Sequence, residues 1–120
     1  MQKIRSDEGS GRYSSMFAAM GNDARLHIMR LLLSAHPQGL TVSEIQAELD
    51  IPSSTLSHHL EKLRTENLVQ VRREGLFLRH TANVQALQGI LAFLFAECCT
   101  RNRAIQPEAI LACCRIKGKL

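Results

Sequence analysis

Residues 41–64 read TVSEIQAELDIPSSTLSHHLEKLR, and this stretch decides the fold. Thr41 and Glu44 have the spacing of a capping box, in which a hydroxyl and a carboxylate bond the free amides at a helix start. That helix must be short, because Pro52 disfavours helical backbone at the residue before it. A second helix is predicted over residues 54–66. Two short helices joined by a tight turn indicate a helix-turn-helix unit.

The second of these helices has two different faces. Leu56, Leu60 and Leu63 recur at helical spacing, which predicts one buried stripe. The opposite face is polar and carries Ser54, Ser57, His58 and Glu61. Small hydroxyls and an imidazole near a helix N-terminus can enter a major groove, where the helix end favours phosphate. A merely solvated polar face is the alternative.

After Asn67 the pattern changes to that of a β-hairpin. Apolar and polar residues alternate over residues 68–73, Glu74-Gly75 turns the chain, and residues 76–80 return as a second strand. Arg72, Arg73 and Arg79 then lie on or beside the hairpin. These arginines can bind along a DNA phosphate backbone, or their only role can be to keep an exposed hairpin soluble.

The flanking segments complete a chain of 120 residues, long enough for one small domain. Residues 1–13 are polar and aperiodic and are predicted to be a flexible arm. Residues 14–101 form the predicted domain, beginning with a helix from Ser14 and a second helix capped by Asn22 or Asp23. The second helix has a predicted buried face made of Leu26, Ile28, Met29, Leu32 and Leu33. Residues 102–120 form a basic tail that contains cysteines.

The last predicted helix begins at Asn83 and is unusually apolar. One face is formed by Val84, Leu87, Leu91, Leu94 and Cys98, and Ile90, Phe93 and Phe95 widen it. This is more apolar surface than a small domain needs to bury, which predicts that the helix packs against a second copy in a homodimer.

Charge and hydropathy exclude little by themselves. The formal net charge is +4, but residues 101–120 account for the whole excess, so net charge is weak evidence for nucleic-acid binding. The longest apolar stretch, residues 90–96, is too short to cross a bilayer, and no signal peptide is apparent. We therefore expect a cytoplasmic protein without a membrane partner.

All four cysteines lie near the C-terminal end of the chain, as the pairs Cys98-Cys99 and Cys113-Cys114. Thiols stay reduced in the cytoplasm, so these residues are predicted to be soft-metal ligands or redox sensors. Adjacent cysteines suit zinc or cadmium poorly, whereas a disulfide or persulfide would give a redox or sulfur sensor. An enzyme with a nucleophilic cysteine is not expected, because Ala104 and Ile105 stand where a Cys-x5-Arg loop needs its arginine.

The order of elements and three segments resemble the winged-helix repressors of the ArsR/SmtB family, over about residues 14–101. The segments are Asn22-Asp23-Ala24-Arg25-Leu26, Ser54 to Arg64 with its Ser-His-His-Leu, and Leu68-Val69 with the Arg73-Glu74-Gly75 turn. The fold implied is mainly α with a small β-hairpin, a winged helix-turn-helix with a helical dimer interface. Asp23 stands where the family usually has the proline that opens the second helix, and Asn67 stands where it usually has the glycine after the recognition helix. Both residues keep the capping chemistry at these helix ends.

The resemblance also implies a function and its residues. A homodimeric repressor would bind double-stranded operator DNA with an imperfect inverted repeat. The predicted DNA-binding residues are Ser54, Thr55, Ser57, His58, Arg72 and Arg73. The protein would leave DNA when trivalent arsenic, as arsenite or methylarsenite, binds the thiolates, with no organic cofactor. The predicted ligands are Cys98 and Cys99, with Cys113 or Cys114 as a third for arsenite.

Overall fold

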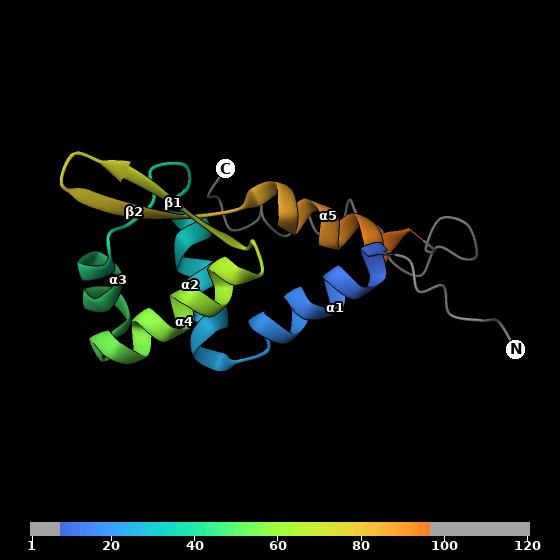
Figure 1. Cartoon of the computed structure of the whole chain (residues 1–120), viewed down its shortest axis with the longest axis horizontal. Helices are drawn as coiled ribbons and strands as arrows, with labels where there is room; N and C mark the ends of the chain where they lie inside the picture. Colours follow the sequence, from blue (N-terminus) through green and yellow to red (C-terminus); the bar gives the residue numbers. More distant parts are fainter. Residues whose placement is uncertain (1–7, 97–120) are drawn as a thin grey trace, which may run out of the picture. The chain divides into compact units, whose positions relative to one another are not determined.

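The computed structural model describes residues 8–96, which form five helices and one two-stranded sheet (Figure 1). The predicted mainly α architecture with a small β-hairpin is thus confirmed. In chain order the elements are α1 (Glu8–Met20), α2 (Asp23–Ser34), α3 (Val42–Leu49), α4 (Ser53–Thr65), β1 (Val69–Glu74), β2 (Phe77–Ala82) and α5 (Val84–Phe95).

The helix-turn-helix unit consists of α3, a short turn and α4. The capping box is present: the Glu44 amide donates to Thr41 Oγ1 at 3.3 Å, and the Thr41 amide donates to Glu44 Oε1 at 2.9 Å. Asp50 ends α3 in the left-handed conformation, with φ 56°, and its amide still bonds the Gln46 carbonyl at 2.8 Å. A short polar side chain tolerates this conformation better than most, so the chain can reverse here without glycine.

One hydrophobic core holds α1 to α4 and the base of the hairpin together. Its fully buried side chains come from every one of these elements and include Met16, Ile28, Leu32, Ile45, Leu56, Leu63, Leu68 and Val69. The predicted stripe of α4 is confirmed, because its three leucines are all buried. Burying a leucine side chain stabilises a fold by about 2 kcal/mol, so this stripe is a main anchor of α4.

The hairpin is antiparallel, and the pairing of Glu74 with Phe77 leaves only Gly75 and Leu76 in the loop. Gly75 has φ 62°, a conformation that glycine adopts without strain. At the other end, β2 pairs with the loop before α3: the Leu40 amide donates to the His80 carbonyl at 3.0 Å, and the His80 amide returns a bond at 2.8 Å. Gly39 is required beside this pairing, since a Cβ there would lie 2.6 Å from the His80 carbonyl oxygen.

Two predictions about the helices before this unit were wrong in part. α1 begins at Glu8 rather than Ser14, so residues 8–13 of the predicted flexible arm are helical. Glycine weakens a helix by about 1 kcal/mol, but extending a helix that is already formed needs no new nucleation. In α2, Leu26 and Leu33 are exposed, not buried. At about 100° per residue they lie beyond the arc that Ile28, Met29 and Leu32 turn toward the core.

The chain divides into two compact units at Leu87, within α5. The first unit contains α1 to β2 and the first turn of α5, and the second contains the rest of α5. Along the described residues, none of the helices has the length and apolar character needed to cross a bilayer.

Candidate nucleic-acid interface

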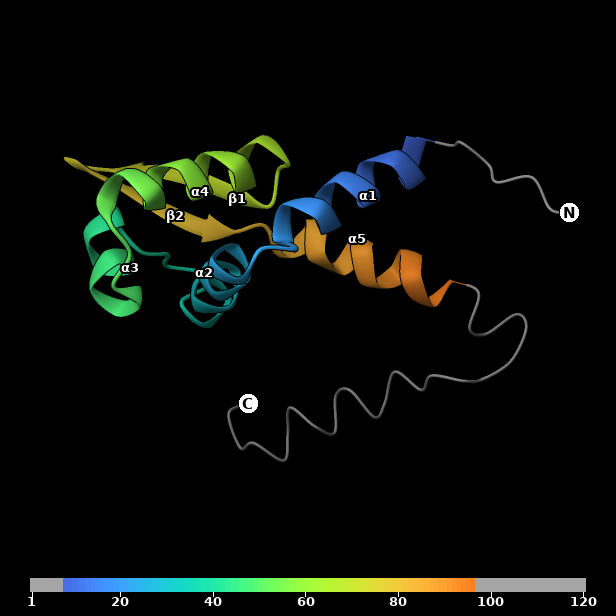
Figure 2. The same ribbon diagram turned by 90° about the horizontal axis from the view of Figure 1, so that it is seen from below.

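The exposed face of α4 carries the residues predicted to bind DNA. Ser54, Thr55, Ser57 and His58 are all exposed, while the leucines behind them are buried. α4 and α3 lie at the end of the unit toward which the hairpin projects, as both views show (Figures 1 and 2). A rigid helix that presents hydroxyls and an imidazole to solvent is suited to hydrogen bonding with base edges.

The N-terminus of α4 is open to an anion. Pro52 is the residue before the helix, and no side chain caps the first turn in the described structure. The first turn also has no acidic residue, whereas the last turn carries Lys62 and Arg64. The free amides and the positive end of the helix dipole therefore face outward, which favours a phosphate at this end.

The two adjacent histidines of α4 have different surroundings. His58 is exposed, but His59 is half-buried, and its Nδ1 lies 3.2 Å from Arg25 Nη1 of α2. A guanidinium only donates, so a hydrogen bond between these two atoms requires His59 Nδ1 to accept, as it does in one tautomer of the neutral ring. Burial first, then the positive charges of Arg25 and His58, lower the pKa of His59. Thus His58 is available to a ligand, and His59 joins α4 to α2.

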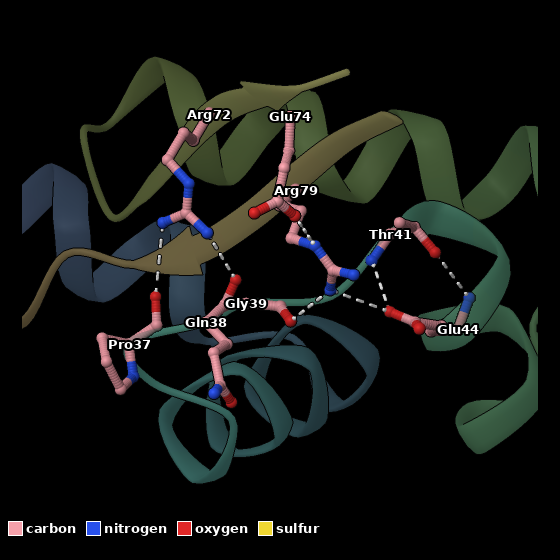
Figure 3. Close-up of polar contacts among 8 residues, drawn as sticks. All are labelled: Pro37, Gln38, Gly39, Thr41, Glu44, Arg72, Glu74 and Arg79. Atoms are coloured by element: carbon pink, nitrogen blue, oxygen red, sulfur yellow. Dashed lines mark hydrogen bonds and ion pairs between the residues drawn. The ribbon is translucent and has the colours of Figure 1, made fainter. Parts of the chain in front are cut away.

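The two arginines predicted to contact DNA from the hairpin are also placed differently. Arg72 donates to the carbonyl oxygens of Pro37 at 3.4 Å and Gln38 at 3.0 Å (Figure 3). Arg73 is exposed, and its side chain makes no hydrogen bond or ion pair with any residue in the described range. Of the two, Arg73 has the whole of its charge available for phosphate.

Arg79 has a structural role that the sequence analysis did not assign. Its Nε donates to Glu74 Oε1 at 2.6 Å, and its Nη1 lies 3.1 Å from the Gly39 carbonyl oxygen and 3.4 Å from Glu44 Oε1 (Figure 3). One guanidinium thus joins both strands of the hairpin to the capping box of α3. In the observed register Arg72 lies directly opposite Arg79, and like charges so placed need neighbouring partners.

The predicted metal ligands Cys98, Cys99, Cys113 and Cys114 lie outside the described residues. Between residues 8 and 96 no group of three histidine, cysteine or acidic side chains is arranged to hold a metal ion. The described structure therefore presents a candidate DNA surface and leaves the arsenic site a prediction from sequence.

Known proteins share this architecture and part of the sequence. A protein-family model described as a helix-turn-helix domain matches residues 20–72 of this chain. The transcriptional activator HlyU of Vibrio cholerae is 29% identical over 97 residues, which are 81% of this chain and 87% of HlyU. Its solved structure superposes with a TM-score of 0.59 at 31% identity, covering 75% of this chain and 98% of that one.

Two arsenic-related names also appear among the similar proteins. The putative arsenical resistance operon repressor ArsR2 of Halobacterium salinarum is 35% identical over 60 residues, half of each chain. An ArsR-like transcriptional regulator from Rhodococcus sp. RHA1 superposes with a TM-score of 0.64 at 22% identity, covering 71% of this chain and 77% of that one. At that identity the Rhodococcus structure supports the winged helix-turn-helix fold alone.

Proposed function

The chain belongs to the ArsR/HlyU family of helix-turn-helix transcriptional regulators, and from this premise we propose that it is an arsenic-responsive repressor. In this proposal a homodimer binds an imperfect inverted repeat in double-stranded DNA. Trivalent arsenic, as arsenite or methylarsenite, then binds the C-terminal cysteines and releases the dimer from DNA.

The observation that carries the DNA-binding surface is the sidedness of α4. Its buried leucines fix the helix on the core, and its outward face holds Ser54, Thr55, Ser57 and His58 in exposed positions. Because the backbone of a packed helix is rigid, these side chains meet a major groove without losing much conformational freedom. Arg73 of the hairpin adds a free positive charge for the phosphates.

The dimer is supported by the exposed apolar side chains of α5. Leu91 is 48% exposed, Phe93 41% and Leu94 52%, and α5 carries no charged residue. Consecutive exposed apolar side chains on one helix favour association, and a second copy of the chain supplies an equally apolar surface. Two copies of α4 related by a two-fold axis would then read half-sites about 34 Å apart.

The arsenic response rests on the thiols and on where they lie in the sequence. Cys98 and Cys99 follow α5 within three and four residues of Phe95. An arsenic atom bound at the end of the proposed dimer helix would change the subunit geometry, so that the two copies of α4 no longer match successive grooves. A third thiolate from Cys113 or Cys114 would suit arsenite, whereas two thiolates suffice for methylarsenite.

Repression itself is part of the proposal, since one named relative is an activator and another a putative repressor. Transcription in vitro from a promoter that contains the bound sequence distinguishes the two. We expect fewer transcripts with the protein and recovery with arsenite.

The DNA-binding part is tested with His58→Ala. A base contact of a recognition helix contributes about 1 to 3 kcal/mol, so this variant should bind specific DNA about tenfold or more weakly. The probe is the duplex that the full chain enriches from a random library. Unchanged affinity for specific DNA would contradict the assignment of α4 as the recognition helix.

The effector is tested by adding arsenite, methylarsenite, zinc, cadmium or polysulfide to the protein bound to the same duplex. We expect release by the arsenicals, and loss of release in Cys98→Ser and Cys99→Ser. If Cys113→Ser/Cys114→Ser loses only the arsenite response, one of these residues is the third ligand. Release by polysulfide that dithiothreitol reverses, without arsenic, would instead establish a sulfur or redox sensor.

A further inference from the structure

A polar groove lies at the base of the hairpin, beside the first turn of α5. It consists of two adjoining cavities, of about 500 Å³ and about 260 Å³, whose walls share Gln70, Asn83 and Gln85. These volumes fit a small metabolite. The recognition helix α4 contributes no residue to either cavity, so the candidate DNA surface does not account for the groove.

The rim of the groove is positively charged. Arg72 of β1 and His36 line the larger cavity, and Arg12 of α1 lines the smaller one. Among the described residues, no aspartate or glutamate lines either cavity, and neither arginine forms an ion pair. Arg72 donates to two backbone carbonyl oxygens (Figure 3), and the Arg12 guanidinium lies 5.5 Å from the centre of the Tyr13 ring. These neutral partners position the guanidinium groups without cancelling their charge, so the groove attracts anions.

The side-chain amides of Gln70 and Gln85 are free for a ligand. Both residues are exposed, line both cavities and make no side-chain hydrogen bond with any residue between 8 and 96. The floor beneath them is buried and fixed, because Asn83 donates to the Asn67 carbonyl at 2.8 Å and accepts from the Ala86 amide at 3.2 Å. Free amides above a fixed floor can bond the oxygen atoms of a ligand with little reorganisation.

A third cavity, of about 400 Å³, shares Arg72 but has balanced charges. Its second arginine, Arg79, donates to Glu74 at 2.6 Å and lies 3.4 Å from Glu44, and both carboxylates line this cavity. An anion there would be repelled by two carboxylates whose arginine is already engaged. The groove at the base of the hairpin therefore offers an anion the more favourable surroundings.

The placement of Arg12 and Arg72 selects the ligand. One arginine lines each cavity, and the shared amides connect the two cavities, so a ligand with two anionic groups can engage both arginines. Arg72 uses two N–H groups on the carbonyls and retains others for a ligand. Guanidinium groups bind both carboxylate and phosphate.

We propose that this groove binds a small organic acid that carries two or more carboxylate or phosphate groups. The protein then has a ligand site that is made entirely of residues from α1, the loop after α2, the hairpin and the start of α5. This inference goes beyond the proposed function, because it requires neither DNA nor a thiol.

The test is calorimetric titration of the full chain, kept reduced and free of DNA, with citrate and with fructose 1,6-bisphosphate at constant ionic strength. The two probes distinguish carboxylates from phosphates, and triethyl citrate keeps the carbon skeleton of citrate without its charges. We expect saturable binding of at least one charged probe at one site per chain, and no binding of triethyl citrate.

Three variants locate the site. Arg12→Ala and Arg72→Ala each remove one charge and should weaken probe binding about tenfold, as expected for the loss of a charge-assisted hydrogen bond. Gln85→Asp adds a carboxylate to the shared wall without removing a side-chain hydrogen bond, and it should weaken binding at least as much. Arg30→Ala is the matched control, because Arg30 is an exposed arginine of α2 that lines none of these cavities. It should bind the probes as the wild type does, and thermal unfolding checks that every variant is folded.

Probe binding that the three variants weaken and Arg30→Ala leaves unchanged supports the proposal. Absence of binding by both charged probes overturns it, as does equal affinity of the wild type, Arg12→Ala and Gln85→Asp. If the duplex enriched from a random library competes with the bound probe, the groove belongs to the DNA surface, and the proposal is also overturned. None of these results decides the proposed function, which is tested by binding and release of DNA.

Discussion

The helices α4 and α5 have nearly the same length, 13 and 12 residues, but they expose opposite kinds of surface. α4 buries three leucines and exposes serine, threonine and histidine, whereas α5 exposes Leu91, Phe93 and Leu94. α4 contains five titratable side chains, and α5 has none. Both helices have the same backbone geometry, so the difference lies in their exposed side chains. Those of α4 suit a charged partner, and those of α5 suit an apolar partner.

The largest expected effect comes from the buried side of α4. Leu63 has no exposed area, so Leu63→Ala should lower the free energy of unfolding by about 3 kcal/mol through lost burial and a residual cavity. Urea unfolding followed by circular dichroism measures this change. Thr55→Ala on the exposed face is the control and should change stability by less than about 0.5 kcal/mol. A comparable loss in both variants would mean that α4 does not have the two faces described.

The exposed side of α5 should contribute to assembly. Leu94 is 52% exposed in the single chain, and a carboxylate placed there would have to lose water in the proposed dimer. Leu94→Asp should weaken dimerisation by about 2 kcal/mol, as expected for a central interface residue. Sedimentation equilibrium measures the dissociation constant.

Gln85→Asp provides the matched control for that charge, since Gln85 is an exposed polar residue of the same helix. It should leave the dissociation constant nearly unchanged. A monomeric wild type, or a Leu94→Asp variant that dimerises normally, would remove α5 from the interface.

A smaller effect should distinguish the two arginines next to the recognition surface. Arg73 is free, so Arg73→Ala should weaken binding to all DNA sequences and lower the slope of log affinity against log salt by about one. Arg72 binds the carbonyls of Pro37 and Gln38, so Arg72→Ala should change mainly stability. Measuring the DNA affinity of the wild type and of both variants between low and moderate salt concentrations gives these slopes. Equal slopes for Arg72→Ala and Arg73→Ala would show that the carbonyl contacts do not withhold Arg72 from DNA.

The smallest effect is on the pH dependence of stability, to which His59 of α4 contributes together with His80 of β2, whose pKa is also lowered, chiefly by burial. The pKa of His59 is lowered in the folded chain, chiefly by burial and then by Arg25 and His58. The unfolded chain therefore binds more protons as the pH falls below the ordinary histidine value of 6.5, and the free energy of unfolding decreases there. His59→Gln should show a shallower decrease between pH 7.5 and pH 5. If the free energy of unfolding of His59→Gln falls with pH as steeply as that of the wild type, His59 does not contribute to this dependence. α5 contains no titratable side chain that could contribute.

Most of the fold was predictable because its signals are local. The capping box at Thr41 and Glu44, the interruption at Pro52 and the turn at Gly75 each depend on a few neighbouring residues, and each appears in the structure near its predicted position. The start of α1 was not predictable in this way. Residues 8–13 are polar and include two glycines, but the helix continues through them, because extending a helix that is already formed needs no new nucleation.

The candidate DNA surface was only partly predictable. The exposed serines and His58 of α4 follow from helical periodicity, and the structure places them as expected. The roles of Arg72, Arg79 and His59 depend on partners far away in the sequence, such as Gln38, Glu44 and Arg25. No local pattern reveals such pairs, because the backbone must first bring α2, α3 and the hairpin together.

The sequence by itself therefore determined which segments are helices and strands and which face of α4 is polar, because periodicity and capping act within a few residues. It also supplied the cysteine pairs on which the proposed arsenic response depends. Only the tertiary structure decided which positive charges remain available. Arg72 and Arg79 are held by carbonyl and carboxylate oxygens of the α3 region, whereas Arg73 faces the other side of the same hairpin beside the exposed tip. Side chains alternate between the two faces of a strand, so adjacent arginines have different partners once one face is packed.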